Sequence, residues 1–127
     1  MARILVIDDY EPLLAMLQAT LEAVGHEVVT AADGVTGLGL VPRFKPDLML
    51  VDVDMPERDG VSVCAEVKSD EATAGIAVLL MTGRPSAELM QRSRAAGATG
   101  VLAKPFVRAV LLDEVERATW GVRPVKA

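Results

Sequence analysis

The sequence contains too little cysteine and histidine to build a disulfide framework or a zinc site. Its 127 residues include one cysteine, Cys64, and one histidine, His26. A disulfide needs two cysteines, and structural zinc sites use four Cys or His ligands. We therefore interpret His26, Cys64 and the methionines as structural or core residues. The low cysteine content favours a cytoplasmic protein.

Long apolar runs and excess positive charge are also absent. The longest apolar runs, 4–7 and 76–81, are far shorter than the roughly 20 residues of a membrane span. We therefore expect neither a signal peptide nor membrane insertion. Lys and Arg number 13 against 18 Asp and Glu, for a formal net charge of -5. Because an acidic domain is repelled by a phosphate backbone, we expect no direct nucleic-acid binding.

Short apolar runs alternate with longer amphipathic segments, a pattern typical of α/β proteins with a parallel sheet. The expected strands are 3–7, 27–30, 47–52, 76–81 and 100–103. The expected helices are 11–24, 34–44, 60–68, 86–96 and 107–119. With strand order 2-1-3-4-5, these elements predict a doubly wound, flavodoxin-like three-layer sandwich. We expect one domain over 1–120 and a short C-terminal tail over 121–127.

The helical periodicity also predicts which side chains face the core. The expected inward faces of the first and last helices are Leu13, Leu17, Leu21 and Val24, and Val107, Leu111, Val115 and Ala118. The second helix contains Gly37, Gly39 and Pro42, each of which lowers helix propensity. We therefore expect that helix to be short or loosely held.

Three carboxylates follow two of the expected strands. Asp8 and Asp9 come directly after the first strand, and Asp52 closes the third. With the expected strand order these strands are neighbours, so the carboxylates converge at the carboxyl edge of the sheet. The resulting repulsion favours a bound divalent cation, and an all-oxygen ligand set suits Mg²⁺.

Two further polar residues end strands at the same edge. Thr82 follows the fourth strand and Lys104 follows the fifth. A hydroxyl, an ammonium and Mg²⁺ together could bind the oxygens of a phosphoryl group, with one carboxylate as nucleophile. Taken singly, each residue is more often structural, since such side chains commonly cap helices or lie on the surface.

The complete set of motifs resembles the response-regulator receiver domain, over about residues 3–119. The motifs, in order, are Asp8-Asp9, Asp52-Val53-Asp54-Met55-Pro56, Asp59-Gly60, Thr82-Gly83 and Lys104-Pro105-Phe106. The resemblance implies a phosphoacceptor of a two-component phosphorelay that receives its phosphoryl group from a histidine kinase or phosphotransfer protein. Such a protein assists its own phosphorylation and dephosphorylation but is not a conventional enzyme.

The resemblance also assigns roles to the site residues. It makes Asp52 the phosphoacceptor and Asp9 the principal Mg²⁺ carboxylate, with Asp8 helping directly or through water. The main-chain carbonyl of Asp54 would be a further Mg²⁺ ligand, and Thr82 and Lys104 would bind the phosphoryl oxygens. The Lys104–Pro105 peptide bond is expected to be cis.

The sequence departs from the family at Val101, where many receivers carry a mobile Tyr or Phe. A β-branched side chain has little rotameric range and no ring to bury. We therefore hypothesise that the signal passes through Thr82 and residues 83–86 into the fourth helix. The same departure keeps open an alternative, a phosphorylation-independent interaction module.

Charged residues near the site carry further hypotheses. Asp54 and Arg84 lie two residues beyond Asp52 and Thr82, positions that in the family modulate phosphoryl lifetime. They could pair with each other or be independent solvated residues. Arg84, Arg92 and Arg94 form either a solvated face or part of a docking face for an acidic partner or a second copy.

The expected docking face comprises the fourth helix, the fifth strand and the fifth helix, and its downstream partner is unknown. Trp120 is interpreted as a packing residue rather than an interface anchor. An aspartyl-phosphate hydrolase is a weaker alternative, because Asp52-Val53-Asp54 also matches the Asp-x-Asp pattern of haloacid-dehalogenase-type enzymes. In that family the motif follows the first strand and a cap encloses the substrate, neither of which fits here.

Overall fold

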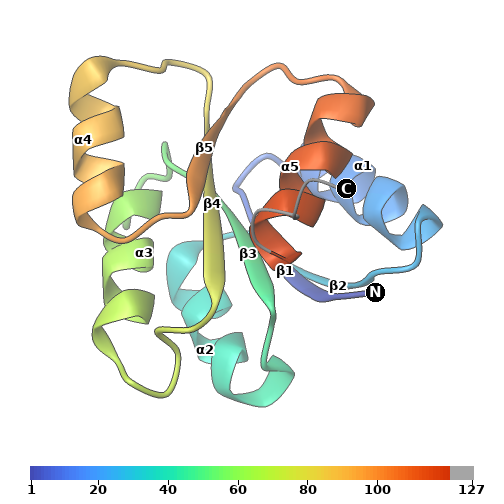
Figure 1. Cartoon of the computed structure of the whole chain (residues 1–127), viewed down its shortest axis with the longest axis horizontal. Coiled ribbons are helices and arrows are strands. Elements are labelled where there is room, and N and C mark those ends of the chain that lie inside the picture. Colours follow the sequence, from blue (N-terminus) through green and yellow to red (C-terminus); the bar gives the residue numbers. More distant parts are fainter. Residues whose placement is uncertain (121–127) are drawn as a thin grey trace, which may run out of the picture.

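The computed structural model describes residues 1–120, which form a parallel sheet between two layers of helices (Figure 1). The strands are β1 (Arg3–Ile7), β2 (Glu27–Ala31), β3 (Leu48–Asp52), β4 (Ala77–Thr82) and β5 (Gly100–Ala103). The helices are α1 (Glu11–Ala23), α2 (Gly34–Phe44), α3 (Gly60–Ser69), α4 (Ala87–Ala95) and α5 (Arg108–Trp120). The strand order is β2-β1-β3-β4-β5. The expected doubly wound fold is therefore confirmed, and every strand and helix end lies within one residue of its expected position.

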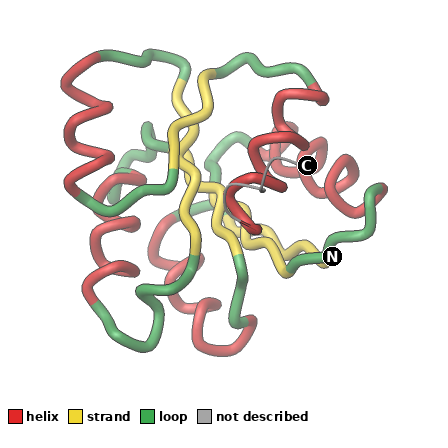
Figure 2. The backbone as a smooth tube through the Cα atoms, viewed as in Figure 1, coloured by secondary structure: helices red, strands yellow, loops and turns green. Residues whose placement is uncertain are grey.

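Each face of the sheet has its own apolar core. Helices α2, α3 and α4 cover one face and α1 and α5 cover the other, as Figures 1 and 2 show. Along β1, Leu5 and Ile7 belong to the first core and Ile4 and Val6 to the second. Because successive strand side chains point to opposite faces, an apolar run buried on both sides is what this three-layer arrangement requires.

Helix α2 is not shortened by its glycines and proline. It spans the expected residues, and its N-terminus is capped by Asp33, whose carboxylate accepts a hydrogen bond from the Thr36 N–H at 2.7 Å. A Cβ atom at Gly37 would lie 2.2 Å from the Ile7 side chain. Gly37 therefore lets α2 pack directly on β1, and this packing outweighs the low helix propensity of the segment.

The expected inward faces of α1 and α5 are partly wrong. Leu14 is buried in α1, whereas Val24 follows the helix and is 44% exposed. Val107 precedes α5 and is 65% exposed, while Leu111 and Val115 are buried as expected. Residues just outside a helix no longer follow the 3.6-residue periodicity, so the pattern does not predict their burial.

The C-terminal part of the chain also differs in detail from the expectation. Trp120 ends α5 with 56% of its surface exposed, so its expected packing is partial at most. The tail expected at 121–127 lies outside the described residues. Among residues 1–120, no helix is both long enough and apolar enough to cross a membrane.

The strand register brings the polar strand ends to one edge of the sheet. Ile7 pairs with Val51, so Asp8 lies next to Asp52 across β1 and β3. Asp52 pairs with Met81, and Thr82 pairs with Ala103, the residue before Lys104. The expected convergence of the site residues thus follows directly from parallel pairing.

Candidate functional site

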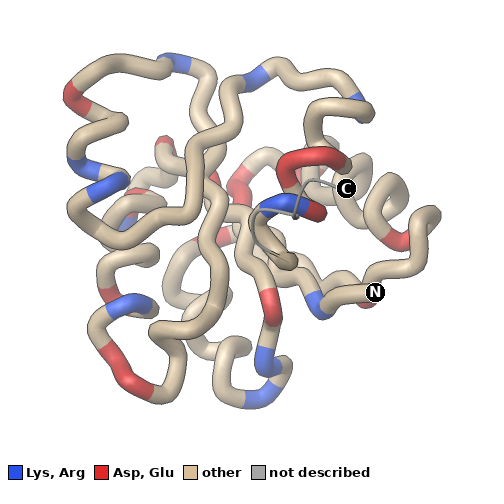
Figure 3. Tube along the Cα trace, in the orientation of Figure 1, with Lys and Arg blue, Asp and Glu red and all other residues tan. Residues whose placement is uncertain are grey.

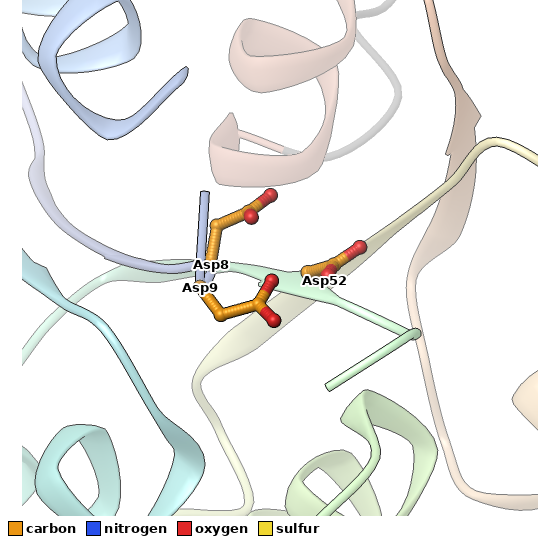
Figure 4. A group of neighbouring side chains, drawn as sticks. All are labelled: Asp8, Asp9 and Asp52. Atoms are coloured by element: carbon orange, nitrogen blue, oxygen red, sulfur yellow. The ribbon is translucent and has the colours of Figure 1, made fainter. Parts of the chain in front are cut away.

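Three carboxylates gather where β1 and β3 end (Figure 4). One oxygen from each of Asp8, Asp9 and Asp52 lies within 4.8 Å of the others. Asp8 and Asp52 are buried, whereas Asp9 is exposed. The cluster therefore contains two buried carboxylates and one that solvent can reach.

Lys104 forms a bridge between the two buried carboxylates. Its ammonium donates hydrogen bonds to Oδ2 of Asp8 at 2.8 Å and to Oδ1 of Asp52 at 3.0 Å. Burial by itself lowers the pKa of Lys104, but the hydrogen bonds and charges of Asp8 and Asp52 outweigh it and raise the pKa. The ammonium is therefore charged at neutral pH and offsets part of the negative charge of the cluster.

The carboxyl group of Asp52 lies in an environment that disfavours its ionised form. Burial raises its pKa most, and the nearby Asp8 charge raises it further, against the opposing effect of Lys104. Asp8 has a second partner, because its Oδ1 accepts a hydrogen bond from the Tyr10 N–H at 2.9 Å. Asp8 is therefore held firmly, while Asp52 carries the destabilised charge that a bound cation would relieve.

Thr82 places a hydroxyl at the same edge, and only 1% of its surface is exposed. Its Oγ1 accepts a hydrogen bond from the Arg84 N–H at 3.0 Å, which leaves the hydroxyl hydrogen able to donate. The carbonyl of Thr82 accepts from the Lys104 N–H at 2.7 Å. The Lys104–Pro105 peptide bond is cis, which confirms the expectation.

The loop after Asp52 turns sharply because Gly60 lets α3 approach the end of β3. A Cβ atom at Gly60 would lie 2.4 Å from the Asp52 carbonyl oxygen. The preceding residue, Asp59, caps α3, with its carboxylate accepting from the Ser62 N–H at 2.9 Å. The Asp59-Gly60 pair therefore supports the backbone that carries Asp52.

The carboxylate set fits a magnesium ion by its chemistry. Mg²⁺ prefers oxygen ligands and is usually held by one or two carboxylates with several retained waters. Asp8, Asp9 and Asp52 supply carboxylate oxygens close together, and exposed Asp9 leaves an entry path from solvent. Sulfur and imidazole ligands, which favour zinc or copper, are absent from the three-residue cluster.

Two ion pairs join the loop after β3 to α4 and to the residues before it. The guanidinium of Arg84 lies 3.4 Å from Oδ1 of Asp54, and that of Arg92 lies 3.6 Å from Oδ2 of Asp59. Of the two hypotheses for Asp54 and Arg84, the structure therefore supports pairing. Neither the Arg92–Asp59 pair nor the contact of Lys104 with Asp8 was predicted, because no local sequence signal indicates them.

Val101 has no ring and little freedom to move. It lies in β5 opposite Leu80 and packs, partly buried, against the core beneath α2, α3 and α4. Val101 therefore cannot play the part of the mobile aromatic ring that many receivers carry at this position.

The doubly wound α/β fold and its acidic edge are those of a receiver-type domain. Residues 4–116 match the family described as the response regulator receiver domain. The chain therefore belongs to the response regulator receiver family.

Individual relatives show the same relationship. The chain is 40% identical to the response regulator PleD of Caulobacter vibrioides over 118 residues, which are 93% of this chain but 26% of PleD. It is 29% identical to protein PilG of Pseudomonas aeruginosa over 98% of this chain and 93% of PilG. The chain thus spans only a quarter or so of one relative and nearly all of the other.

Solved structures agree with this assignment. The chemotaxis protein CheY4 of Vibrio cholerae superposes with a TM-score of 0.89 at 35% identity, covering 93% of this chain and 98% of CheY4. The receiver domain of a sensor histidine kinase from Pseudomonas aeruginosa, solved with magnesium in its active-site cleft, has a TM-score of 0.85 at 27% identity, covering 94% of this chain and 98% of that domain.

The receiver family has a general role. Receiver domains are signalling domains of two-component systems rather than classical enzymes. They generally bind Mg²⁺ at their acidic site and accept a phosphoryl group from histidine kinases or phosphotransfer proteins.

Proposed function

We propose that this protein is a phosphorelay response regulator whose phosphoacceptor is Asp52. The observation that carries the proposal is the placement of Asp52 beside both Asp9 and Lys104 at the carboxyl edge of the sheet. A carboxylate next to a cation-binding cluster and a fixed ammonium is positioned to react with a group rich in negative oxygens. A histidine kinase or phosphotransfer protein would supply that group.

The Mg²⁺ site would be formed by Asp9, Asp8 and Asp52, with the main-chain carbonyl of Asp54 as a further ligand by analogy with the family. When bound, the ion would neutralise charge on the carboxylates and on the phosphoryl oxygens. A related receiver domain, described above, holds magnesium in its active-site cleft, which supports an ion at this acidic edge. Exposed Asp9 is the ligand whose loss should reduce ion binding without leaving a buried cavity.

In the transfer step, a carboxylate oxygen of Asp52 forms a bond to the phosphorus of the donor phosphohistidine. The bond between phosphorus and the imidazole nitrogen breaks, and its electron pair leaves with the imidazole. Lys104 and the Thr82 hydroxyl are placed to donate hydrogen bonds to the transferred oxygens. Water later attacks the phosphorus, releasing inorganic phosphate and restoring the carboxylate.

The proposed output surface is the face formed by α4, β5 and α5. Exposed apolar side chains lie on its two helices, with Met90 40% and Val110 46% exposed. Exposed Arg94 adds positive charge on α4 of an otherwise acidic protein. This composition suits an acidic downstream protein or a second copy of the chain.

The proposal is tested by the intact mass after incubation with Mg²⁺ and a small acyl-phosphate donor. We expect a gain of one phosphoryl group that is absent from Asp52→Asn and from a magnesium-free control. If small donors fail, a phosphohistidine protein should still transfer its label to the unaltered chain. Failure with both donors would favour the phosphorylation-independent interaction module, which the Val101 side chain also suits.

A further inference from the structure

A hollow of about 310 Å³ lies at the edge of the sheet opposite the carboxylate cluster. The carboxylates follow their strands, whereas this hollow is bordered by residues that precede β1 and β2 and by α5. The side chains around it include those of Met1, Val24, His26, Asp113, Glu116 and Trp120. A segment that docked here would therefore leave Asp52 accessible at the other end of the strands.

Three large apolar side chains around the hollow are exposed. Met1 is 84% exposed, Val24 44% and Trp120 56%. Burial of apolar surface is the main favourable contribution to most association, and grouped exposed apolar side chains are typical of interaction sites. Because Trp120 is the only tryptophan of the chain, its indole ring reports directly on whether this surface is covered.

The polar part of the hollow is acidic. Asp113 and Glu116 supply two carboxylates, and the amino group of Met1 is the one cation among the residues of 1–120 that line it. Figure 3 shows acidic positions gathered along α5. Arg117 pairs with Asp113 from outside the hollow, but the two side chains are 59% and 50% exposed, so the pair is weak. The hollow therefore favours an occupant that combines apolar side chains with positive charge.

The chain continues from the rim of this hollow with a segment of that composition. Residues 121–127 follow Trp120 and read Gly-Val-Arg-Pro-Val-Lys-Ala, with two basic residues and no acidic residue. Five consecutive residues reach at most about 17 Å, enough to cross a hollow of this size. A segment tethered at the rim has an effective concentration there on the order of millimolar, so weak contacts suffice for docking.

We propose that the hollow is a docking site for residues 122–126 of the same chain. The two valines of this segment pack against Trp120, and its arginine and lysine face the carboxylates of Asp113 and Glu116. The docked segment connects the end of α5 to the residues that precede β1 and β2, and so restrains α5 against the sheet. Docking does not require phosphorylation, because the hollow and Asp52 lie at opposite ends of the strands.

Fluorescence of Trp120 tests this proposal on the full chain. We expect Val122→Ser combined with Val125→Ser to shift the emission to longer wavelength and to increase quenching by acrylamide, because the indole ring becomes exposed to water. Arg123→Glu combined with Lys126→Glu should have the same effect, since it places negative charge against an acidic hollow. Far-UV circular dichroism checks that the fold of each variant is unchanged.

Charge reversal in the hollow distinguishes a specific contact from a general effect of charge on the segment. Asp113→Lys combined with Glu116→Lys should increase quenching when introduced alone. The same pair of changes should restore low quenching when Arg123→Glu and Lys126→Glu are also present.

Two exposed residues on the other face of the sheet provide matched controls. Val35 lies on α2 and is 62% exposed, and Arg94 is exposed on α4. Val35→Ser and Arg94→Glu repeat the apolar and the charge changes away from the hollow. Both variants should keep the emission and the acrylamide quenching of the unaltered protein.

Unchanged emission and quenching in both segment variants would overturn the proposal. So would a failure of the reversed charges in the hollow to compensate for those on the segment. Quenching of the unaltered protein that falls as its concentration rises would assign the hollow to a second copy of the chain and overturn docking within one chain. A failure of Asp52 to accept a phosphoryl group would overturn the proposed function and leave this docking site unaffected.

Discussion

The Lys104 ammonium lies 3.0 Å from the Asp52 carboxylate and holds it together with Asp8, at 2.8 Å, across the ends of β1 and β3. The lysine therefore has a structural role that does not depend on a bound phosphoryl group. Its side chain is 23% exposed, against 1% for Asp8 and 5% for Asp52. The negative charges of the two buried carboxylates are therefore balanced in part by the ammonium of a less buried lysine.

Replacing Lys104 should therefore reduce stability as well as phosphorylation. Lys104→Met keeps most of the side-chain volume but leaves two buried carboxylates without their ammonium, which should lower the free energy of unfolding by about 2–4 kcal/mol. Urea unfolding at neutral pH measures the loss. Adding Asp8→Asn to Lys104→Met should recover part of it by removing one of the unpaired charges. A Lys104→Met variant as stable as the unaltered protein would show that the bridge contributes nothing.

Magnesium should stabilise the folded protein through the same cluster. At a free Mg²⁺ concentration ten times the dissociation constant, a single site adds about 1.4 kcal/mol to the free energy of unfolding. Asp9→Asn should remove most of this gain, which thermal unfolding with and without Mg²⁺ would measure. Asp113→Asn, on the exposed side of α5, serves as the control and should keep the full gain. Equal gains in Asp9→Asn and the control would place the ion elsewhere.

Gly60 should be intolerant of a methyl group. A Cβ atom would lie 2.4 Å from the Asp52 carbonyl, so Gly60→Ala must push α3 away from β3 and cost about 1–3 kcal/mol. It should also slow phosphorylation by moving the Asp52 backbone. Gly39→Ala is the matched control, because Gly39 is exposed in α2 and has open space around its Cβ position. That variant should gain about 0.5–1 kcal/mol in chemical unfolding.

Titration of His26 should make the free energy of unfolding depend on pH, at pH values above those at which Asp and Glu titrate. Its Nδ1 accepts a hydrogen bond from the Ala2 N–H at 3.0 Å, which requires the neutral ring. Burial, and then the charge of the N-terminal amino group, lower the pKa of His26 against the opposing effect of Glu116.

The unfolded chain therefore binds a proton more readily than the folded one. Stability from this contact is complete above the unfolded value of about 6.5 and is lost as pH falls below it. His26→Asn offers an acceptor that does not titrate. The change in unfolding free energy between pH 7.5 and 5.5, measured in urea, should be smaller in this variant. A slope equal to that of the unaltered protein would exclude His26 as its source.

The element order, and the strand ends that carry Asp8, Asp52 and Thr82, could be predicted from local sequence patterns. Apolar runs, capping residues and helix-ending glycines are local signals, so they can be read without knowing what packs against them. When strands and helices alternate along the chain, few arrangements of a five-stranded parallel sheet are possible. The edge of the sheet where the carboxylates lie could therefore be predicted.

Contacts between residues far apart in the sequence depend on tertiary packing and could not be predicted. Lys104 donates a hydrogen bond to Asp8, which lies 96 positions away in the sequence. Gly37 leaves room for the Ile7 side chain, so α2 forms a full helix despite its low helix propensity. The ion pair between Arg92 and Asp59 is a third contact of this kind. Such contacts depend on strand register and on the rotation of each helix about its axis. Both are set by packing across the whole core, and no single segment of sequence records them.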